Sequence, residues 1–292
     1  MRELPSPFIP LSDLQTPPAH WGSLHPRSHH RVADLARARA DTTTFEVSWA
    51  RTEDDIRQAQ ALRYQVFAVE MGARLTSSGH HRGHPREALD IDLFDPYCEH
   101  LLVRAQTECG APGAGPVIGT YRLLTPAAAL RVGGLYTEAE FDLTRLRPLR
   151  SKMVELGRSC VHADWRCGGV IMALWGALGE FMTRNDLDTM VGCASVSMRD
   201  GGHVAASLWE RLRKTHLAAI EWQVQPRLPL PVEELRRDLQ VEAPALIKGY
   251  LRCGAKVLGP PAWDPDFNSA DLPLLMRIGD LPTRYRKHFL GN

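Results

Sequence analysis

The stretch from Lys152 to Leu178 constrains the fold more than any other part of the chain. It opens with the short, largely apolar run 153–161, which is typical of a buried strand. After Gly168 and Gly169, apolar residues recur at helical spacing and predict a helix with one wide apolar stripe. This strand, turn and helix together place free backbone N–H groups at a helix N-terminus, where an anion can bind.

Two charged residues, Glu155 and Arg158, interrupt the apolar strand. A buried strand carries charges at a cost unless they are paired or used. The two residues have opposite parity, so a regular strand would direct them to opposite faces of the sheet. Gly157 lies between them, and a glycine inside a strand often marks a bulge. We therefore predict a bulge that brings the carboxylate and the guanidinium onto the same side.

The order of the remaining elements predicts one α/β domain with a mixed sheet and helices on both faces. Further strands are expected at 45–49, 100–104, 117–124, 190–196, 256–258 and 272–278, and further helices at 56–69, 204–216, 244–253 and 284–289. Residues 1–44 are rich in proline, histidine and arginine, which predicts a disordered or loosely docked N-terminal arm. The domain is then expected to span 45–292.

Composition limits the kinds of partner. The formal net charge is +1 without a basic stripe, which argues against nucleic acid. The six cysteines include no CxxC pair, which favours a reducing compartment without disulfides. No apolar run approaches the roughly 18 residues of a membrane span, and no signal peptide is evident, so we expect a cytoplasmic protein. His80, His81 and His84 lie in a glycine-rich loop and are interpreted as solvated rather than as metal ligands.

Other charged residues lie at unusual places. Arg63, Phe67 and Glu70 share one face of the first predicted helix, where a solvated arginine is the ordinary interpretation. Arg122 lies within a strand and requires an anionic partner. The segment 90–95 alternates aspartates with large apolar residues, which indicates carboxylates held inward against the body of the domain.

Several of these segments resemble known motifs. Residues 155–169 are similar to the strand–turn–helix signature of the GNAT superfamily of acyltransferases. The segments 63–67, 92–95, 119–122 and 155–158 resemble, in this order, the motifs of the branch that contains acyl-homoserine-lactone synthases and L-ornithine N-alpha-acyltransferases of ornithine-lipid synthesis. The segments 98–103, 133–136, 141–143, 192–195 and 248–262 resemble the ornithine acyltransferases in particular. The resemblance covers about 45–289.

This resemblance implies a GNAT-like, splayed β-sheet that binds an acyl-pantetheine thioester between two strands. It implies an N-acyltransferase that moves a (3-hydroxy) fatty acyl chain from acyl carrier protein to the α-amine of L-ornithine, giving lyso-ornithine lipid. Ile171 occupies the place of a small residue in the usual superfamily turn. Because it crowds the pocket for the pyrophosphate of coenzyme A, we expect acyl carrier protein as the donor, and no metal or resident cofactor.

The resemblance also implies roles for the residues. Glu155 is the expected general base, with a structural ion pair to Arg158 as the alternative. The acyl-pantetheine is expected to contact Ser159, Cys160, Val161, Arg166, Gly168 and Gly169, with backbone N–H groups of 159–161 polarising the carbonyl. The amino-acid substrate is expected to contact Arg63, Phe67, Asp92, Asp95, Arg122 and Arg158, with arginines on its carboxylate and an aspartate on its distal ammonium.

Alternatives stay open at this point. Asp92 and Asp95 could instead hold their loop against Arg63 or Arg122. Cys160 is interpreted as a packed strand residue, although a ping-pong mechanism could use it with His162 as its base. The enzyme could acylate another amino acid or make an acyl-homoserine-lactone-type signal, or the fold could bind acyl carrier protein without catalysis. The basic tail 284–288 and the arm are candidates for a peripheral membrane contact.

Overall fold

The computed structural model describes residues 45–75, 88–106, 113, 115–166 and 169–290. The predicted arm over 1–44 and the three loop histidines lie outside these residues. Within the described part of the chain, no helix has both the length and the apolar character that a membrane crossing requires.

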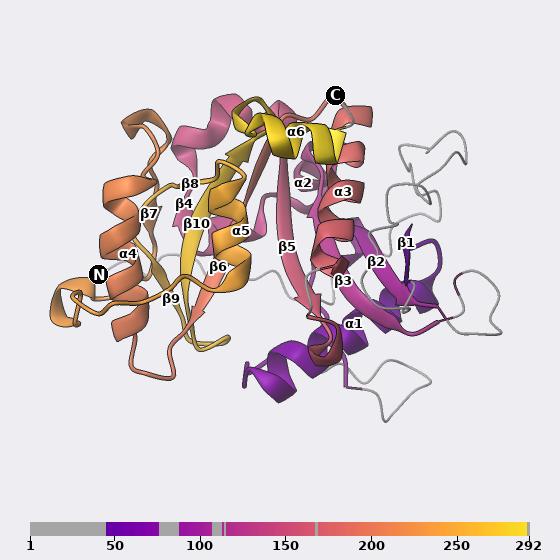
Figure 1. Ribbon diagram of the computed structural model, residues 1–292, viewed down its shortest axis with the longest axis horizontal. Coiled ribbons are helices and arrows are strands. Elements are labelled where there is room, and N and C mark those ends of the chain that lie inside the picture. Colours follow the sequence, from indigo (N-terminus) through magenta and orange to yellow (C-terminus); the bar gives the residue numbers. More distant parts are fainter. Residues whose placement is uncertain (1–44, 76–87, 107–112, 114, 167–168, 291–292) are drawn as a thin grey trace, which may run out of the picture. The chain divides into compact units, whose positions relative to one another are not determined.

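The strands form one mixed sheet in the order β1, β2, β3, β5, β6, β10 and β8, with β9 paired to β10 (Figure 1). Their bounds are β1 Phe45–Trp49, β2 Glu99–Ala105, β3 Val117–Leu124, β5 Met153–Val161, β6 Thr189–Ser197, β8 Lys256–Val257, β9 Ala262–Asp264 and β10 Ser269–Arg277. Strands β5 and β6 are parallel, whereas the other pairs of named strands are antiparallel. A separate short pair joins β4, Phe141–Asp142, to β7, Gln225–Pro226.

The helices cover both faces of the sheet, as predicted. Their bounds are α1 Glu53–Tyr64, α2 Pro126–Val132, α3 Gly169–Arg184, α4 His203–Thr215, α5 Ala245–Arg252 and α6 Thr283–Leu290. Thr52 is the N-cap of helix α1, since its side chain accepts a hydrogen bond from the Asp55 N–H. It continues as a π-helix over Gln65–Glu70. Helix α2 and the 3₁₀ helices η4, Tyr136–Ala139, and η5, Thr144–Lys152, lie where the sequence predicted only a connection.

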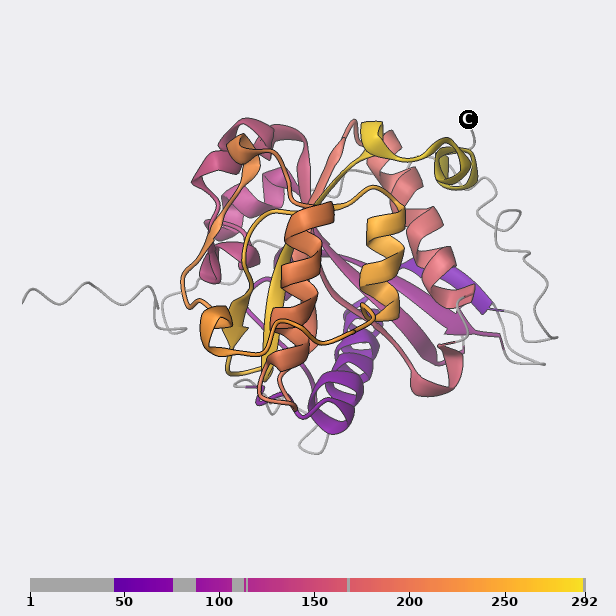
Figure 2. The same cartoon turned by 60° about the vertical axis from the view of Figure 1, so that its left-hand side comes forward.

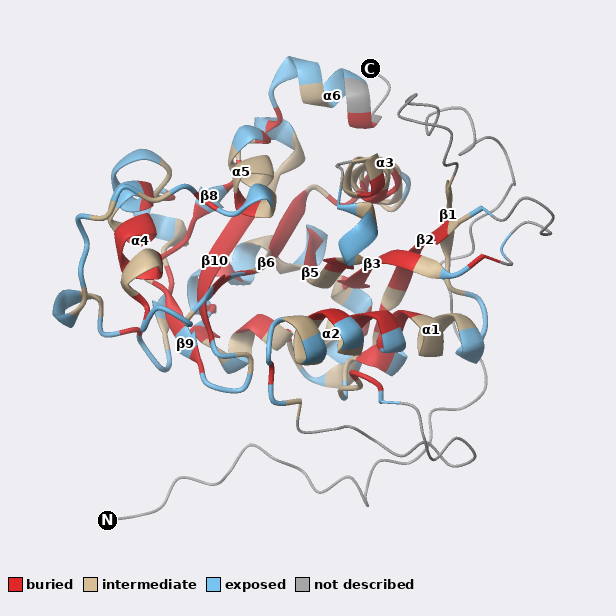
Figure 3. Ribbon diagram, turned by 60° about the horizontal axis from the view of Figure 1, so that its bottom comes forward, coloured by how far each residue is buried: buried red, intermediate tan, exposed pale blue. Residues whose placement is uncertain are grey.

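The core lies on both sides of the sheet (Figure 3). On one face, α3 packs against β2, β3 and β5, while α4 and α5 pack against β6 and β10 (Figure 2). On the other face, α1 packs near the end of β5, and α2, η4 and η5 cover the sheet around the start of β5. Helix α6 packs against α3. The join between β5 and β6 is therefore enclosed from both sides.

Strand β5 carries the predicted bulge. Its pairing with β3 shifts register between Thr120 and Arg122, so that one residue of β3 faces two of β5. The residue with the unusual backbone is Arg158, whose φ is +52°, a left-handed conformation that is uncommon outside glycine. The bulge thus falls one residue after Gly157, the glycine that indicated it.

The bulge places both charged side chains on the same side of the strand, as predicted. Glu155 accepts a hydrogen bond from the backbone N–H of Tyr136 at 2.7 Å. The guanidinium carbon of Arg158 lies 4.8 Å from the centre of the ring of the same tyrosine. The ion pair between Glu155 and Arg158, the alternative to a catalytic role, is not among the ion pairs of the described residues, since Arg158 bonds to aspartates.

Strands β5 and β6 separate part of the way along their length. Their pairing begins at Met153 and ends at Glu155, opposite Val191. At the next residue, a Cβ atom on Gly192 would lie 2.3 Å from the Leu156 carbonyl oxygen, so only glycine fits there. Beyond this point the two strands line opposite sides of a cavity. The sheet is therefore splayed at β5 and β6, as the resemblance implied.

Candidate active site

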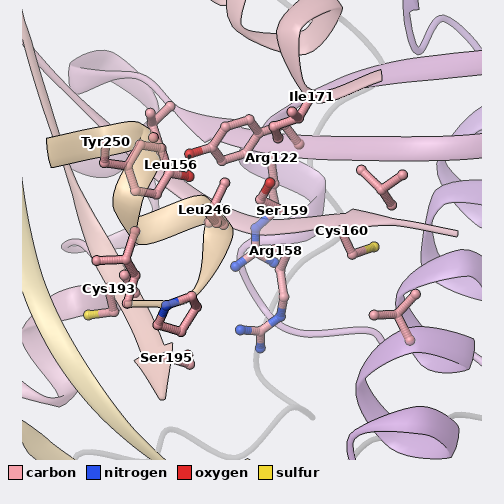
Figure 4. A pocket seen from close by; sticks show the side chains of 18 of the residues that line it. Arg122, Leu156, Arg158, Ser159, Cys160, Ile171, Cys193, Ser195, Leu246 and Tyr250 are labelled. Carbon is pink, nitrogen blue, oxygen red and sulfur yellow. Dashed lines mark hydrogen bonds between the residues drawn. The ribbon is translucent and has the colours of Figure 1, made fainter. Parts of the chain in front are cut away.

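The cavity between the splayed strands has a volume of about 700 Å³. Leu156, Ser159 and Cys160 line it from β5, and Cys193 and Ser195 line it from β6 (Figure 4). Apolar side chains from both faces of the sheet complete the wall, among them Phe67, Phe94, Ile171, Trp175, Leu246 and Tyr250. A mostly apolar cavity of this size suits a fatty acyl chain.

Glu155 lines this cavity near the point where the strands separate. Its carboxylate accepts 2.7 Å hydrogen bonds from the backbone N–H groups of Tyr136 and Thr137, one on each oxygen. Burial raises the pKa of Glu155 above its ordinary value, although the two N–H groups and the positive charge of Arg122 oppose this shift. The Thr137 side chain also hydrogen-bonds to this carboxylate. A carboxylate offers about four lone-pair sites, so the group is held in place by three donors and can still accept a proton.

Three arginines and three aspartates form a buried ion-pair network beside the cavity. Arg63 bonds to Asp90 at 2.8 Å and Asp95 at 2.9 Å. Arg122 bonds to Asp92 at 2.6 Å and Asp95 at 2.8 Å. The formal charges of the six groups cancel, and this offsets the cost of burying them. The structure therefore shows the alternative in which the aspartates hold their segment against Arg63 and Arg122.

Arg63, Asp92 and Asp95 lie outside the lining of the cavity. The Arg63 side chain is 1% exposed, and its Nε, Nη1 and Nη2 atoms all donate to the two aspartates. The ion pairs occupy the charged groups of Arg63, Asp92 and Asp95, and a contact of these three residues with the substrate stays a prediction.

Arg158 is the most accessible arginine of the network. Its side chain is 11% exposed, against 5% for Arg122, and both residues line the cavity. Its Nε lies 3.1 Å from Asp90, and its guanidinium also lies 4.6 Å from the centre of the Phe267 ring. Phe67 packs edge-on against Phe267 and lines the cavity too. Of the arginines expected on the substrate carboxylate, Arg158 has the most suitable position.

The predicted acyl-pantetheine residues Ser159, Cys160 and Val161 all line the cavity. Burial raises the pKa of the Cys160 thiol to about 12. A thiol that stays neutral at physiological pH is a weak nucleophile. This agrees with the interpretation of Cys160 as a packed strand residue.

The turn after β5 contributes Arg166 to the cavity lining. The Arg166 guanidinium bonds to Glu70 at 2.6 Å and to the Val161 carbonyl at 3.0 Å, which ties the turn to the end of the π-helix that follows α1. Gly169 begins α3, as predicted, and Ile171 lies in the cavity wall. Gly168 lies outside the described residues.

Sequence reasoning missed two tyrosines that meet at the cavity. The hydroxyl groups of Tyr121, from β3, and Tyr250, from α5, lie 2.6 Å apart, and Tyr250 also hydrogen-bonds to the Ser159 side chain. The ring of Tyr250 stacks on Trp175 with centroids 5.3 Å apart. A Cβ on Gly249 would lie 2.4 Å from this tryptophan. The glycine beside Tyr250 was a signal for this close packing.

Sequence reasoning also missed an acidic group on the cavity's other side, formed by Glu140, Asp264 and Asp271. Ligand atoms of Glu140, Cys193 and Asp271 lie within 4.8 Å of one another, and these three are the set of described residues that could hold a metal ion. No local pattern indicated this group, because Glu140 and Cys193 lie far from Asp264 and Asp271 in the sequence.

Comparison with known proteins agrees with this geometry. Residues 62–176 match the acetyltransferase (GNAT) domain family. The L-ornithine N(alpha)-acyltransferase of Agrobacterium fabrum is 34% identical over 259 residues, covering 85% of this chain and 86% of that protein. The enzyme of the same name from Rhodobacter capsulatus is 34% identical over 256 residues, covering 84% and 95%.

Among solved structures, the chain resembles the acyl-homoserine-lactone synthase LasI, with a TM-score of 0.46 and 14% identity over 86% of this chain and 96% of that one. The two L-ornithine N(alpha)-acyltransferases above share about a third of their residues with this chain over most of its length. The protein therefore belongs to the L-ornithine N(alpha)-acyltransferase family and is an acyltransferase with a GNAT-like α/β fold.

Proposed function

We propose that this enzyme transfers a (3-hydroxy) fatty acyl chain from acyl carrier protein to the α-amine of L-ornithine and so forms lyso-ornithine lipid. One observation supports this proposal above the others: a long apolar cavity opens at the splay of β5 and β6 with Glu155 on its wall. The names of the relatives supply the amino-acid substrate.

In the proposed reaction, the α-amine attacks the carbonyl carbon of the acyl thioester. The new C–N bond forms, the C–S bond breaks, and the pantetheine leaves as a thiolate, which takes a proton from solvent. Glu155 takes the proton that the amine loses, directly or through a water molecule, and returns to the carboxylate when it releases that proton to solvent. The base must be ionised before each cycle, so the rate is expected to rise with pH through its pKa.

The remaining roles follow from position. Arg158 would hold the α-carboxylate of the amino acid, because it reaches the cavity from a network that fixes its direction. Backbone N–H groups of Ser159 to Val161, on the β5 edge that β6 has left, would polarise the thioester carbonyl.

The donor is proposed from the turn that follows β5. Ile171 lies in the cavity wall near Arg166 and would narrow the space for the pyrophosphate of coenzyme A, whereas acyl carrier protein brings a single phosphodiester. We expect a higher kcat/KM with acyl carrier protein than with the matching acyl-coenzyme A. Ile171→Ala is expected to reduce this preference, and an unchanged ratio would count against the steric reason.

Lipid mass spectrometry tests the substrate and product together. A bacterial host that lacks aminolipids would be analysed with and without the expressed chain. The proposal predicts a new species with the mass of ornithine and an amide-linked hydroxy-acyl chain, and Glu155→Gln is expected to abolish it. A new amide of a different amino acid would retain acyl transfer and reject ornithine.

We also propose a peripheral membrane contact through α6. Its Arg284, Arg286 and Lys287 are exposed, and Tyr285 of the same helix lines the cavity. A basic surface beside the cavity suits a lipid product and an anionic membrane. Sedimentation with anionic but not neutral vesicles, lost when the three basic residues become alanine, is the expected result. Equal sedimentation with both vesicle types would reject this contact.

A further inference from the structure

Three carboxyl groups gather beside the cavity. Glu140 follows η4, Asp264 ends β9, and Asp271 lies in β10, where it pairs with Ser195 of β6. Asp264 and Asp271 line the cavity together with Cys193. Ligand atoms of Glu140, Cys193 and Asp271 lie within 4.8 Å of one another. Three carboxyl groups without a cation are therefore concentrated beside the substrate cavity.

These carboxylates lack the cationic partners that the other buried acids have. Both carboxyl oxygens of Glu140 are buried, and among the described residues their hydrogen-bond partners are limited to the neighbouring Asp271 and Cys193, neither of which is a cation. Asp271 is 4% exposed and receives one 2.9 Å hydrogen bond, from the hydroxyl of Ser269. In the described part of the chain, none of the ion pairs involves Glu140, Asp264 or Asp271. Buried acceptors left without donors are costly, and this cost points to a missing donor.

The acidic group lies close to the proposed base. The Cys193 thiol contacts the Thr137 hydroxyl at 3.8 Å. The backbone N–H of the same threonine holds Glu155 at 2.7 Å. A small molecule with one end at Glu155 therefore has its other end within reach of the carboxylates.

On the basis of the proposed function, we propose that Glu140, Asp264 and Asp271 bind the side-chain ammonium of a diamino-acid substrate and so select it over amino acids with neutral side chains. An alkylammonium brings three N–H donors, which match the free oxygens of Glu140 and Asp271. This assignment replaces the expected role of Asp92 and Asp95, whose charges Arg63, Arg122 and Arg158 neutralise.

A metal ion is the other cation that such a group could hold. Burial, followed by the charges of Glu140 and Asp271, holds the pKa of the Cys193 thiol well above its ordinary value. The thiolate is the form that binds metals, so this set offers two carboxylates and a neutral thiol. An ammonium needs only the oxygen acceptors, and the cavity is where an amino-acid substrate must enter. The chemistry therefore favours the ammonium.

The test compares two substrates that differ by one amino group. The kcat/KM of the purified full-length enzyme would be measured for L-ornithine and for L-norvaline, which has the same carbon skeleton without the distal amine. Asp271→Asn and Glu140→Gln are the test variants. Asp266→Asn is the matched control, because Asp266 is exposed and lies outside the cavity lining. Circular dichroism would show that each variant is folded.

We expect the parent to prefer L-ornithine strongly and the test variants to lose about 30- to 1,000-fold in kcat/KM for ornithine, the effect of losing one partner of a buried charge pair. Their kcat/KM for norvaline is expected to be unchanged or higher, and the control is expected to match the parent. If a test variant does not fold, L-ornithine but not L-norvaline must still raise the thermal midpoint of the parent.

Three results would overturn the inference. If the folded test variants keep the parent's ratio of kcat/KM for L-ornithine to kcat/KM for L-norvaline, the carboxyl groups do not bind the side chain of the amino-acid substrate. A parent that acylates both amino acids equally well would reject the inference and leave acyl transfer intact, whereas a parent that acylates neither would reject the proposed function itself. Activity that a chelator abolishes and zinc or magnesium alone restores would assign the carboxylates to a metal.

Discussion

Replacing Asp95 by asparagine removes one charge from the centre of the buried ion-pair network. Asp95 accepts hydrogen bonds from Arg63 at 2.9 Å, from Arg122 at 2.8 Å and from Gln60 at 3.0 Å. Asparagine keeps the shape but offers one acceptor oxygen and turns an NH₂ group towards these donors. The balance of three positive and three negative groups becomes three against two.

Removing one partner of a buried ion pair costs about 3–5 kcal/mol. For a domain of this size, that cost corresponds to a fall in the thermal midpoint of roughly 6–20 °C. The measurement is urea denaturation followed by circular dichroism, with thermal denaturation alongside. Asp238→Asn is the control, because Asp238 is 75% exposed where it pairs with Arg236, and such surface pairs contribute about 0–1 kcal/mol.

The pH dependence adds a second signature. The positive charges of Arg63 and Arg122 hold the pKa of Asp95 well below its usual range, and they outweigh the opposing effect of burial. A carboxyl group whose pKa is lower in the folded than in the unfolded state stabilises the fold at pH values above the unfolded-state pKa, which is about 3.9 for aspartate. The difference in the free energy of unfolding between the parent and Asp95→Asn should therefore be largest at pH 6 and above. It should shrink as the pH falls below about 4. A loss under 1 kcal/mol at pH 6, equal to that of Asp238→Asn, would refute the reasoning.

Three further predictions concern the splay, the thiol and the acidic group. Gly192→Ala places a Cβ 2.3 Å from the Leu156 carbonyl oxygen, so we expect a loss of about 1–3 kcal/mol in the free energy of unfolding. The control Gly176→Ala, whose Cβ would have nothing within 4 Å, should be neutral or stabilising. Equal urea midpoints for the two variants would contradict this prediction. Cys160→Ala should keep most of the acyl-transfer rate, because the buried thiol has a pKa of about 12; a folded variant without activity would establish it as a nucleophile. Burial, with Asp271 and Asp264 adding negative charge, raises the pKa of Glu140 from 4.5 to about 10. The fold should therefore lose stability as the pH rises through this window, and Glu140→Gln should flatten that dependence in denaturation curves from pH 5 to 9; parallel curves would contradict it.

The sequence predicted the parts of this protein that depend on local pattern. The opposite parity of Glu155 and Arg158 along the strand predicted the bulge, and the helical spacing of apolar residues after Gly169 predicted α3. Both signals come from the side-chain periodicity within a single strand or helix. The left-handed residue at the bulge is Arg158 and not Gly157, and the Arg158 side chain forms ion pairs with Asp90 and Asp92. Those partners lie more than 60 residues away in the sequence.

The same limit applies to the candidate site. Arg63 lies on a helix where a solvated arginine was the ordinary interpretation, and only the packing of the segment with Asp90 and Asp95 makes it interior. The group of Glu140, Asp264 and Asp271 forms because β9, β10 and the end of η4 meet at one end of the cavity. Tertiary contacts of this kind leave no periodic signal in the chain.

The pH profile of acyl transfer tests the central claim most directly, which is that Glu155 deprotonates an amine beside a thioester held in the splay. The parent's kcat/KM should rise with pH through a pKa that burial holds above the ordinary glutamate value. Glu155→Gln should fold, lose about 10²–10⁴-fold in kcat/KM and lose that rise. A folded Glu155→Gln enzyme with the parent's rate and the parent's pH profile would contradict the account.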